Sequence, residues 1–186
     1  CKPDPKNATF DSSKSDLEKA DLCKKRDSYD SAIVFYSQAA DHYFKSEKWD
    51  KWILGVNGII DCYRFKPDLP EAFRVLNKWD SIARNKISVR SLEFSTLNQK
   101  RGILFSESGE YENSSQGFQQ AVNLRLSLGI KKDTAVALIY NGMGTNSYYL
   151  GKYDEAFNYY TRAVKNYDSL GMTQTVDYAM FIQNVG

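Results

Sequence analysis

The sequence repeats itself at an interval of 42 residues. Gly109-Glu110-Tyr111 recurs as Gly151-Lys152-Tyr153, and 151 minus 109 is 42. The pairs that share this offset include Gly102 with Gly144, Phe118 with Tyr160, and Ala121-Val122 with Ala163-Val164. A repeat of this length is one supersecondary unit, which cannot bury its apolar face alone, so neighbouring units must stack. The chain is thereby constrained to an array of similar units.

Each unit carries a stripe of apolar residues at helical spacing. In the last complete unit the stripe comprises Tyr153, Ala156, Tyr160, Ala163 and Tyr167. Steps of three and four residues place such a stripe along one face of an α-helix, which must then pack against a neighbour. Gly151 permits a tight turn before this helix, and Gly144 is small enough for two helices to approach closely. We predict helical hairpins, with Tyr153 and Tyr160 filling the space toward the next hairpin.

The repeat extends back through most of the chain. Ala72 lies 42 residues before Ser114, and Ala32 lies 72 minus 32, or 40, residues before Ala72. Gly129 and Gly171 stand where the second helix of a unit would end, as C-terminal caps. The predicted organisation is a flexible tether over 1–13 and a repeat domain over 14–186, with hairpins at about 14–47, 49–85, 88–128 and 133–171 and a partial fifth over 174–186.

The spacing of small and aromatic residues resembles that of the tetratricopeptide repeat. Residues 151–163 read Gly-x-Tyr-x-x-Ala-x-x-x-Tyr-x-x-Ala, and the preceding helix has small and aromatic residues at or next to the signature positions. These are Tyr140, Met143, Gly144 and Tyr148. The resemblance begins at about residue 14. It is weakest over 49–85, where Pro67 replaces the turn glycine and Trp79 stands where a small alanine is usual.

The resemblance implies an all-α fold, a right-handed α-solenoid of stacked antiparallel helix hairpins. The long interval and the segments 124–144 and 169–186 are similar to the linked repeats of Bacteroidetes-type signalling proteins and lipoproteins. In those proteins such repeats precede histidine-kinase, transcriptional-regulator or CHAT protease-like domains. One reading is therefore a sensory or regulatory region of a larger bacterial signal-transduction protein, with its activity downstream of residue 186.

The sequence offers no catalytic or metal-binding constellation. The single histidine, His42, has no acidic or thiol partner at metal-ligand spacing. There is no Gly-x-x-x-x-Gly-Lys-Ser/Thr loop and no Gly-x-Ser-x-Gly turn. A formal charge of +2 without a long basic run gives no support for nucleic-acid binding. We predict a chain that is not an enzyme and that needs no cofactor and no metal.

The three cysteines have different settings. Cys23 and Cys62 fall inside helical apolar patterns and are expected to be buried. Cys1 is followed by a polar segment, as in a mature bacterial lipoprotein, which predicts a lipid on Cys1 and a location in the bacterial cell envelope. The alternative is a chain boundary that happens to fall at a cysteine, and the location would then be cytoplasmic. No apolar run approaches the roughly 20 residues of a membrane-spanning helix.

The remaining candidate for function is the concave face that the first helices of stacked hairpins would line. The residues predicted to face this groove are Asn57, Asp61, Arg64, Gln99, Ile103, Asn141, Thr145 and Tyr148. Amides can pair with a peptide backbone and an arginine can pair with a carboxylate, while Ile103 and Tyr148 offer apolar contacts. We predict a protein–protein interaction scaffold that binds a peptide or a partner helix there.

The end of the sequence falls inside an expected first helix. Met180, Phe181, Ile182 and Val185 would need a further helix to cover them. We expect that the natural protein continues past Gly186, that its ordered part ends here, or that a second copy covers this end by self-association.

Overall fold

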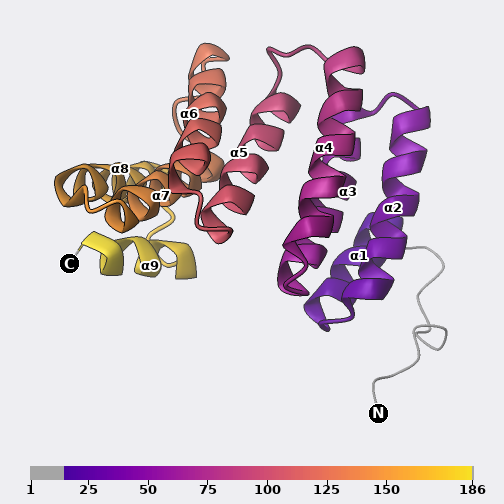
Figure 1. Ribbon diagram of the computed structural model, residues 1–186, viewed down its shortest axis with the longest axis horizontal. Coiled ribbons are helices and arrows are strands. Elements are labelled where there is room, and N and C mark those ends of the chain that lie inside the picture. The colour runs from indigo at the N-terminus through magenta and orange to yellow at the C-terminus, as the bar shows by residue number, and fades with distance from the viewer. Residues whose placement is uncertain (1–14, 186) are drawn as a thin grey trace. The chain divides into compact units, whose positions relative to one another are not determined.

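The computed structural model describes residues 15–185 of the protein and contains only helices within that range (Figure 1). The helices are α1 (Asp16–Lys25), α2 (Tyr29–Lys45), α3 (Trp49–Phe65), α4 (Leu69–Lys86), α5 (Leu92–Glu107), α6 (Tyr111–Ser127), α7 (Thr134–Tyr149), α8 (Tyr153–Ser169) and α9 (Val176–Val185). The prediction of an all-α fold is confirmed. Cys1 and the predicted tether over 1–13 lie outside the described residues.

The helices divide between two compact units. The N-terminal unit, up to Ile87, contains α1 to α4, and the C-terminal unit, from Ser88 onward, contains α5 to α9. Within each unit, consecutive helices are joined by short connections and pack against each other. In the C-terminal unit α5 packs against α6 and α7 against α8, while α9 lies against α8.

Local sequence explains where several helices begin. Ser15 and Glu18 form a reciprocal capping box at the start of α1. The side chains of Asp68, Ser91 and Asp133 each accept a hydrogen bond from a backbone N–H in the first turn of α4, α5 and α7. These bonds satisfy N–H groups that a helix start leaves without an intrahelical partner.

Glycines with positive φ follow α5, α6, α7 and α8 of the C-terminal unit. Gly109, Gly129, Gly151 and Gly171 have φ between 68° and 81°, a conformation that glycine adopts without steric cost. The predicted turn at Gly151 and the predicted caps at Gly129 and Gly171 are therefore confirmed.

Aromatic side chains of the second helices pack against glycines of the first helices. Phe118 on α6 is buried between Gly102 on α5 and Gly142 on α7. A Cβ atom added to either glycine would lie 2.6 Å from the Phe118 ring. A Cβ atom added to Gly144 on α7 would likewise lie 2.6 Å from the ring of Tyr160 on α8. The repeated glycines are thus explained by packing, because a side chain there would displace a buried ring.

One predicted core residue is on the surface. Ala156, Tyr160, Ala163 and Tyr167 are buried as the stripe predicts, but the side chain of Tyr153 is 64% exposed. The core assignment of Tyr153 is wrong because this residue begins α8, directly after the turn, where the hairpin reaches solvent. Its ring instead makes an edge-to-face contact with Tyr148, with 5.5 Å between the ring centroids.

A cluster of aromatic rings fills the N-terminal unit at Trp79, where the repeat pattern expects a small residue. The ring of Trp79 on α4 lies edge-on to Trp52 on α3, with centroids 5.5 Å apart. Trp49 and Phe44 complete the cluster, and Trp52 is fully buried. Small residues at this position would let α3 and α4 approach closely. Here large aromatic rings fill the space between the two helices instead.

Both cysteines in the described residues are buried free thiols. Burial raises the pKa of the Cys62 thiol to about 12, so the reactive thiolate would be on the order of one part in ten thousand at pH 8.

Iodoacetamide is expected to leave Cys62 unmodified in the native protein and to modify it in urea. An exposed control, Ser46→Cys, should react quickly without urea. Peptide mapping by mass spectrometry measures both, and rapid native modification of Cys62 would contradict the assigned burial.

Candidate partner-binding site

The predicted groove residues of the N-terminal unit share one face of α3. Asn57, Asp61 and Arg64 follow each other at steps of four and three residues. Arg64 Nη1 donates to Asp61 Oδ1 at 2.8 Å, and both side chains are less than one fifth exposed. The Oδ1 atom of Asn57 is shielded from solvent and has no hydrogen-bond partner among the described residues. The structure thus pairs Asp61 with Arg64 and leaves one acceptor beside them without a donor.

The predicted groove residues of the C-terminal unit lie on α5 and α7 and differ in their contacts. Thr145 Oγ1 donates to the Asn141 carbonyl oxygen at 3.1 Å and accepts from Tyr160 Oη at 3.4 Å. Asn141 Oδ1 accepts from Asn184 Nδ2 of α9 at 2.9 Å. The amide of Asn141 therefore links α7 to α9.

The other three predicted residues of this unit differ in exposure. Ile103 packs against the buried core cluster of the unit, and Gln99 is half-buried on the same helix. Tyr148, near the end of α7, is 55% exposed. Tyr148 is therefore the predicted groove residue of this unit that offers the most surface to a partner.

A buried polar network, not foreseen from the sequence, holds α7 against α5 and α6. Asn146 on α7 is fully buried, and its Nδ2 donates to Ser114 Oγ at 2.8 Å and to Ser115 Oγ at 3.1 Å. Its Oδ1 accepts from Ser106 Oγ at 3.0 Å. Because a buried amide is costly unless it is paired, these bonds fix the register of three helices. These bonds thereby set the distance between α5 and α7, the two first helices that carry the predicted groove residues of this unit.

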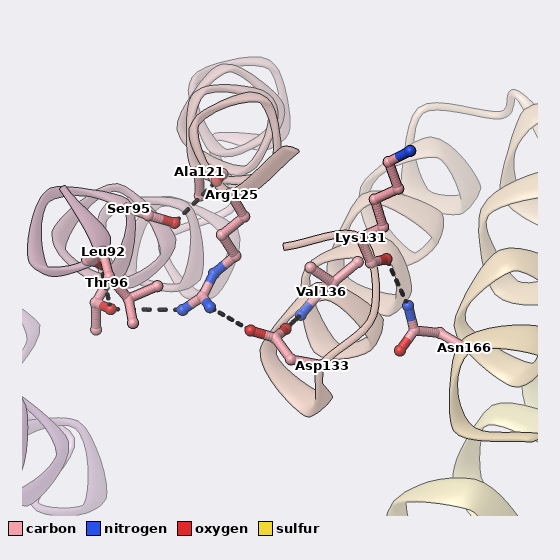
Figure 2. Close-up of polar contacts among 9 residues, drawn as sticks. All are labelled: Leu92, Ser95, Thr96, Ala121, Arg125, Lys131, Asp133, Val136 and Asn166. Carbon is pink, nitrogen blue, oxygen red and sulfur yellow. Dashed lines mark hydrogen bonds and ion pairs between the residues drawn. The ribbon is translucent and has the colours of Figure 1, made fainter. Parts of the chain in front are cut away.

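A buried arginine joins the two hairpins of the C-terminal unit, as Figure 2 shows. Arg125 near the end of α6 is 4% exposed, and its Nη1 donates to Asp133 Oδ2 at 2.5 Å. Its Nη2 lies 3.5 Å from Thr96 Oγ1 on α5. Asp133 also accepts at Oδ1 from the Val136 N–H at 2.6 Å, which caps α7. One carboxylate thus neutralises the buried guanidinium and starts the next helix.

The connection between α6 and α7 is held at a second point by Asn166 of α8. Its Nδ2 donates to the Lys131 carbonyl oxygen at 3.3 Å. For the contact between Arg125 and Asp133, the sequence gives one signal. Arg125 is a charged residue four positions after Ala121, on a stripe of buried residues. A charge at such a position calls for a buried partner, although the repeat alone does not identify it.

Residues 15–185 contain no group of three or more metal-ligating side chains. Among the same residues, no helix combines the length and the apolar character that crossing a membrane requires. His42 lies exposed in the last turn of α2.

Comparison with known proteins agrees with this architecture. A family model described as the tetratricopeptide repeat matches residues 92–169. The crystal structure of BtubC (BKLC) from P. vanneervenii is similar, with a TM-score of 0.73 and 18% identity over 89% of this chain and 67% of that one. A candidate kinesin light chain of Podosopora anserina with nearly identical TPR-like repeats gives a TM-score of 0.69 and 10% identity, over 92% and 82%. A search of curated proteins found no significant match.

At these identities the two solved structures show the fold alone. Both are TPR-like repeat proteins. Together with the helical hairpins of α1 to α9, the likeness confirms the prediction of an α-solenoid fold. The similarity to repeats of Bacteroidetes-type proteins stays a prediction.

Proposed function

Since the chain is a tetratricopeptide-repeat protein, we propose that it is a non-enzymatic module that binds an extended segment of a protein partner along its first helices. Repeats of this family are in general protein-interaction modules. In stacked hairpins the first helices line the concave face. An extended peptide on such a face presents backbone N–H and C=O groups, which side-chain amides can pair.

The observation that carries this proposal is the amide of Asn57. A shielded acceptor without a donor costs about 1–3 kcal/mol, and Asn57 Oδ1 is such an atom. Because this oxygen is shielded from solvent, the Asn57 amide would rotate toward the exposed side of α3 to accept a peptide backbone N–H, which would supply the missing donor. Asp61 and Arg64 continue the same face, where their ion pair fixes two polar groups beside the peptide path.

Peptide selection on the immobilised chain tests the proposal. Peptides would be selected from a random displayed library, synthesised, and titrated against the protein by isothermal calorimetry. Asn57→Ala is expected to raise the Kd about tenfold, which corresponds to the loss of about 1.4 kcal/mol from one shielded hydrogen bond.

A matched asparagine on a second helix provides the control. Asn77 on α4 is exposed, so Asn77→Ala removes the same chemical group from outside the proposed site and should leave the Kd unchanged. Equal affinities for wild type and Asn57→Ala, with unchanged circular dichroism, would remove α3 from the binding site.

Two finer expectations are proposals with their own test. These are the envelope location through a lipid on Cys1, and the alternative that the repeats form the sensory or regulatory region of a larger signalling protein. Intact-mass spectrometry of the natively produced protein separates them. A diacylglyceryl mass on Cys1 would support the envelope location, and a mass far above 21.3 kDa would support the larger protein.

A further inference from the structure

Four tyrosine rings form a continuous surface cluster in the C-terminal unit. Tyr111, which begins α6, stacks on Tyr149, which ends α7, with centroids 4.8 Å apart and planes 7° apart. Tyr148 lies edge-to-face with Tyr149 at 5.8 Å and with Tyr153 at 5.5 Å. We call this cluster of Tyr111, Tyr148, Tyr149 and Tyr153 the tyrosine edge. It combines side chains from α6, α7 and α8.

The tyrosine edge is open to solvent. The side chains of Tyr148, Tyr149 and Tyr153 are 55%, 61% and 64% exposed. Phe157, one turn further along α8, is 53% exposed. Isolated exposed apolar side chains are ordinary, whereas a contiguous exposed aromatic patch is typical of a binding surface.

The N-terminal unit contains the corresponding ring stack, and there the chain supplies its own cations. Tyr29, which begins α2, stacks on Phe65, which ends α3, at 5.8 Å. The guanidinium of Arg64 lies 5.7 Å from the Phe65 ring centroid. Lys66 Nζ pairs with Asp30 Oδ1 at 2.5 Å across the same turn. Rings, guanidinium, ammonium and carboxylate thus form one local set.

The C-terminal unit retains the rings and the acid of this set but lacks both cations. The penultimate residue of the first helix is Arg64 in α3 and Tyr148 in α7, and the residue after the helix is Lys66 in one unit and Leu150 in the other. The second residue of the second helix is acidic in both units. It is Asp30 in α2 and Glu112 in α6.

The carboxylate of Glu112 is consequently unpaired. It is exposed, and within residues 15–185 it has no hydrogen bond or ion pair. An open depression of about 420 Å³ adjoins the tyrosine edge at Tyr153, and it is lined by Gly151, Lys152, Tyr153, Asp154 and Glu155. It contains two carboxylates and one ammonium. Acidic groups therefore outnumber basic ones around the exposed rings.

We infer that the tyrosine edge binds a partner protein segment that carries arginine, with a guanidinium stacked on the exposed rings and paired with Glu112. A planar guanidinium stacks on aromatic faces and pairs with carboxylates at the same time, which an ammonium does less well. This fold already contains such a contact, because the guanidinium of Arg162 lies 4.1 Å from the Tyr140 ring centroid. The site lies where hairpin turns meet solvent, and of the predicted groove residues it includes only Tyr148.

Fluorescence anisotropy with a labelled peptide of three Gly-Ser-Arg units tests the inference on the full chain. A saturable rise is expected with the arginine peptide, at least fivefold weaker binding with lysine in place of arginine, and no saturable binding with citrulline, which keeps the shape of arginine without its charge. Glu112→Gln should weaken arginine-peptide binding at least fivefold.

Tyr148→Arg is the most specific test, because it gives α7 an arginine as its penultimate residue, as α3 has in Arg64. Its own guanidinium should occupy the rings and abolish peptide binding. Gln120→Arg on the exposed face of α6 adds the same charge elsewhere and should change the Kd less than twofold. Circular dichroism would show that all variants are folded.

Three outcomes would overturn the inference. These are absence of saturable binding by the arginine peptide, equal binding of the citrulline peptide, and equal weakening by Tyr148→Arg and Gln120→Arg. Light scattering tests whether a second copy of the chain occupies the tyrosine edge instead. If the wild-type chain is a dimer and Tyr148→Arg is a monomer, a second copy covers this surface. Asn57→Ala should leave arginine-peptide binding unchanged, so this result is independent of the proposed α3 site.

Discussion

Replacing Phe118 with alanine is expected to lower the free energy of unfolding by about 3–5 kcal/mol. The ring is 3% exposed and lies between Gly102 and Gly142. Since neither glycine has a side chain that could move into the space, the cavity should stay largely open. Urea unfolding followed by far-UV circular dichroism measures the change. Phe118→Leu should have a smaller effect because it refills part of the volume.

A tyrosine with the same helical spacing but a different environment provides the control. Tyr153→Ala should change the free energy of unfolding by about 0.5 kcal/mol or less, because its side chain is 64% exposed. A loss of several kcal/mol in Tyr153→Ala would show that this ring is packed after all. A loss below about 1 kcal/mol in Phe118→Ala would be incompatible with the contacts to the two glycines.

Replacing Asp133 with alanine is expected to destabilise the protein by about 3 kcal/mol or more. The change leaves the guanidinium of Arg125 buried without its counter-charge, which typically costs about 3–5 kcal/mol. It also removes the N-cap of α7, worth about 1 kcal/mol. The same urea measurement applies, with Asp154→Ala as the control. Asp154 is an exposed acid in the first turn of α8, and it has no hydrogen bond or ion pair within the described part of the chain.

Two further variants separate the ion pair from the cap. Asp133→Ser keeps a capping side chain but removes the charge, so its stability should fall between wild type and Asp133→Ala. Combining Asp133→Ser with Arg125→Met removes the buried charge as well and should recover part of the loss. If the double variant is no more stable than Asp133→Ser, the buried charge is not the source of the destabilisation.

The elements of this fold that the sequence could predict are those with local causes. The stripe through Ala156, Tyr160 and Ala163 and the turn glycines Gly151 and Gly171 depend on residues within one hairpin, and the structure agrees with each of them. Tyr153 has the same spacing, yet it is exposed. Periodicity identifies a helix face but does not indicate how far along the helix that face stays covered.

The features that the sequence could not predict depend on contacts between hairpins. Arg125 and Asp133 are eight residues apart on either side of a connection, and their meeting depends on how α6 and α7 pack. The tyrosine edge brings Tyr111 next to Tyr149, 38 residues later, as 149 minus 111 shows. Whether the eight predicted groove residues bind a partner stays a prediction. The structure shows that Asp61 already pairs with Arg64 and that Asn141 already pairs with Asn184.

The aromatic cluster of the N-terminal unit has a spectroscopic consequence. The sequence has three tryptophans, and Trp49, Trp52 and Trp79 all belong to that cluster. Intrinsic tryptophan emission is therefore a reporter for the N-terminal unit, and two of its three fluorophores are on α3, the helix of Asn57. A peptide that binds along α3 should shift this emission without any added label. Tyrosine absorbance can follow binding at the tyrosine edge, because Tyr111, Tyr148, Tyr149 and Tyr153 are among its sources.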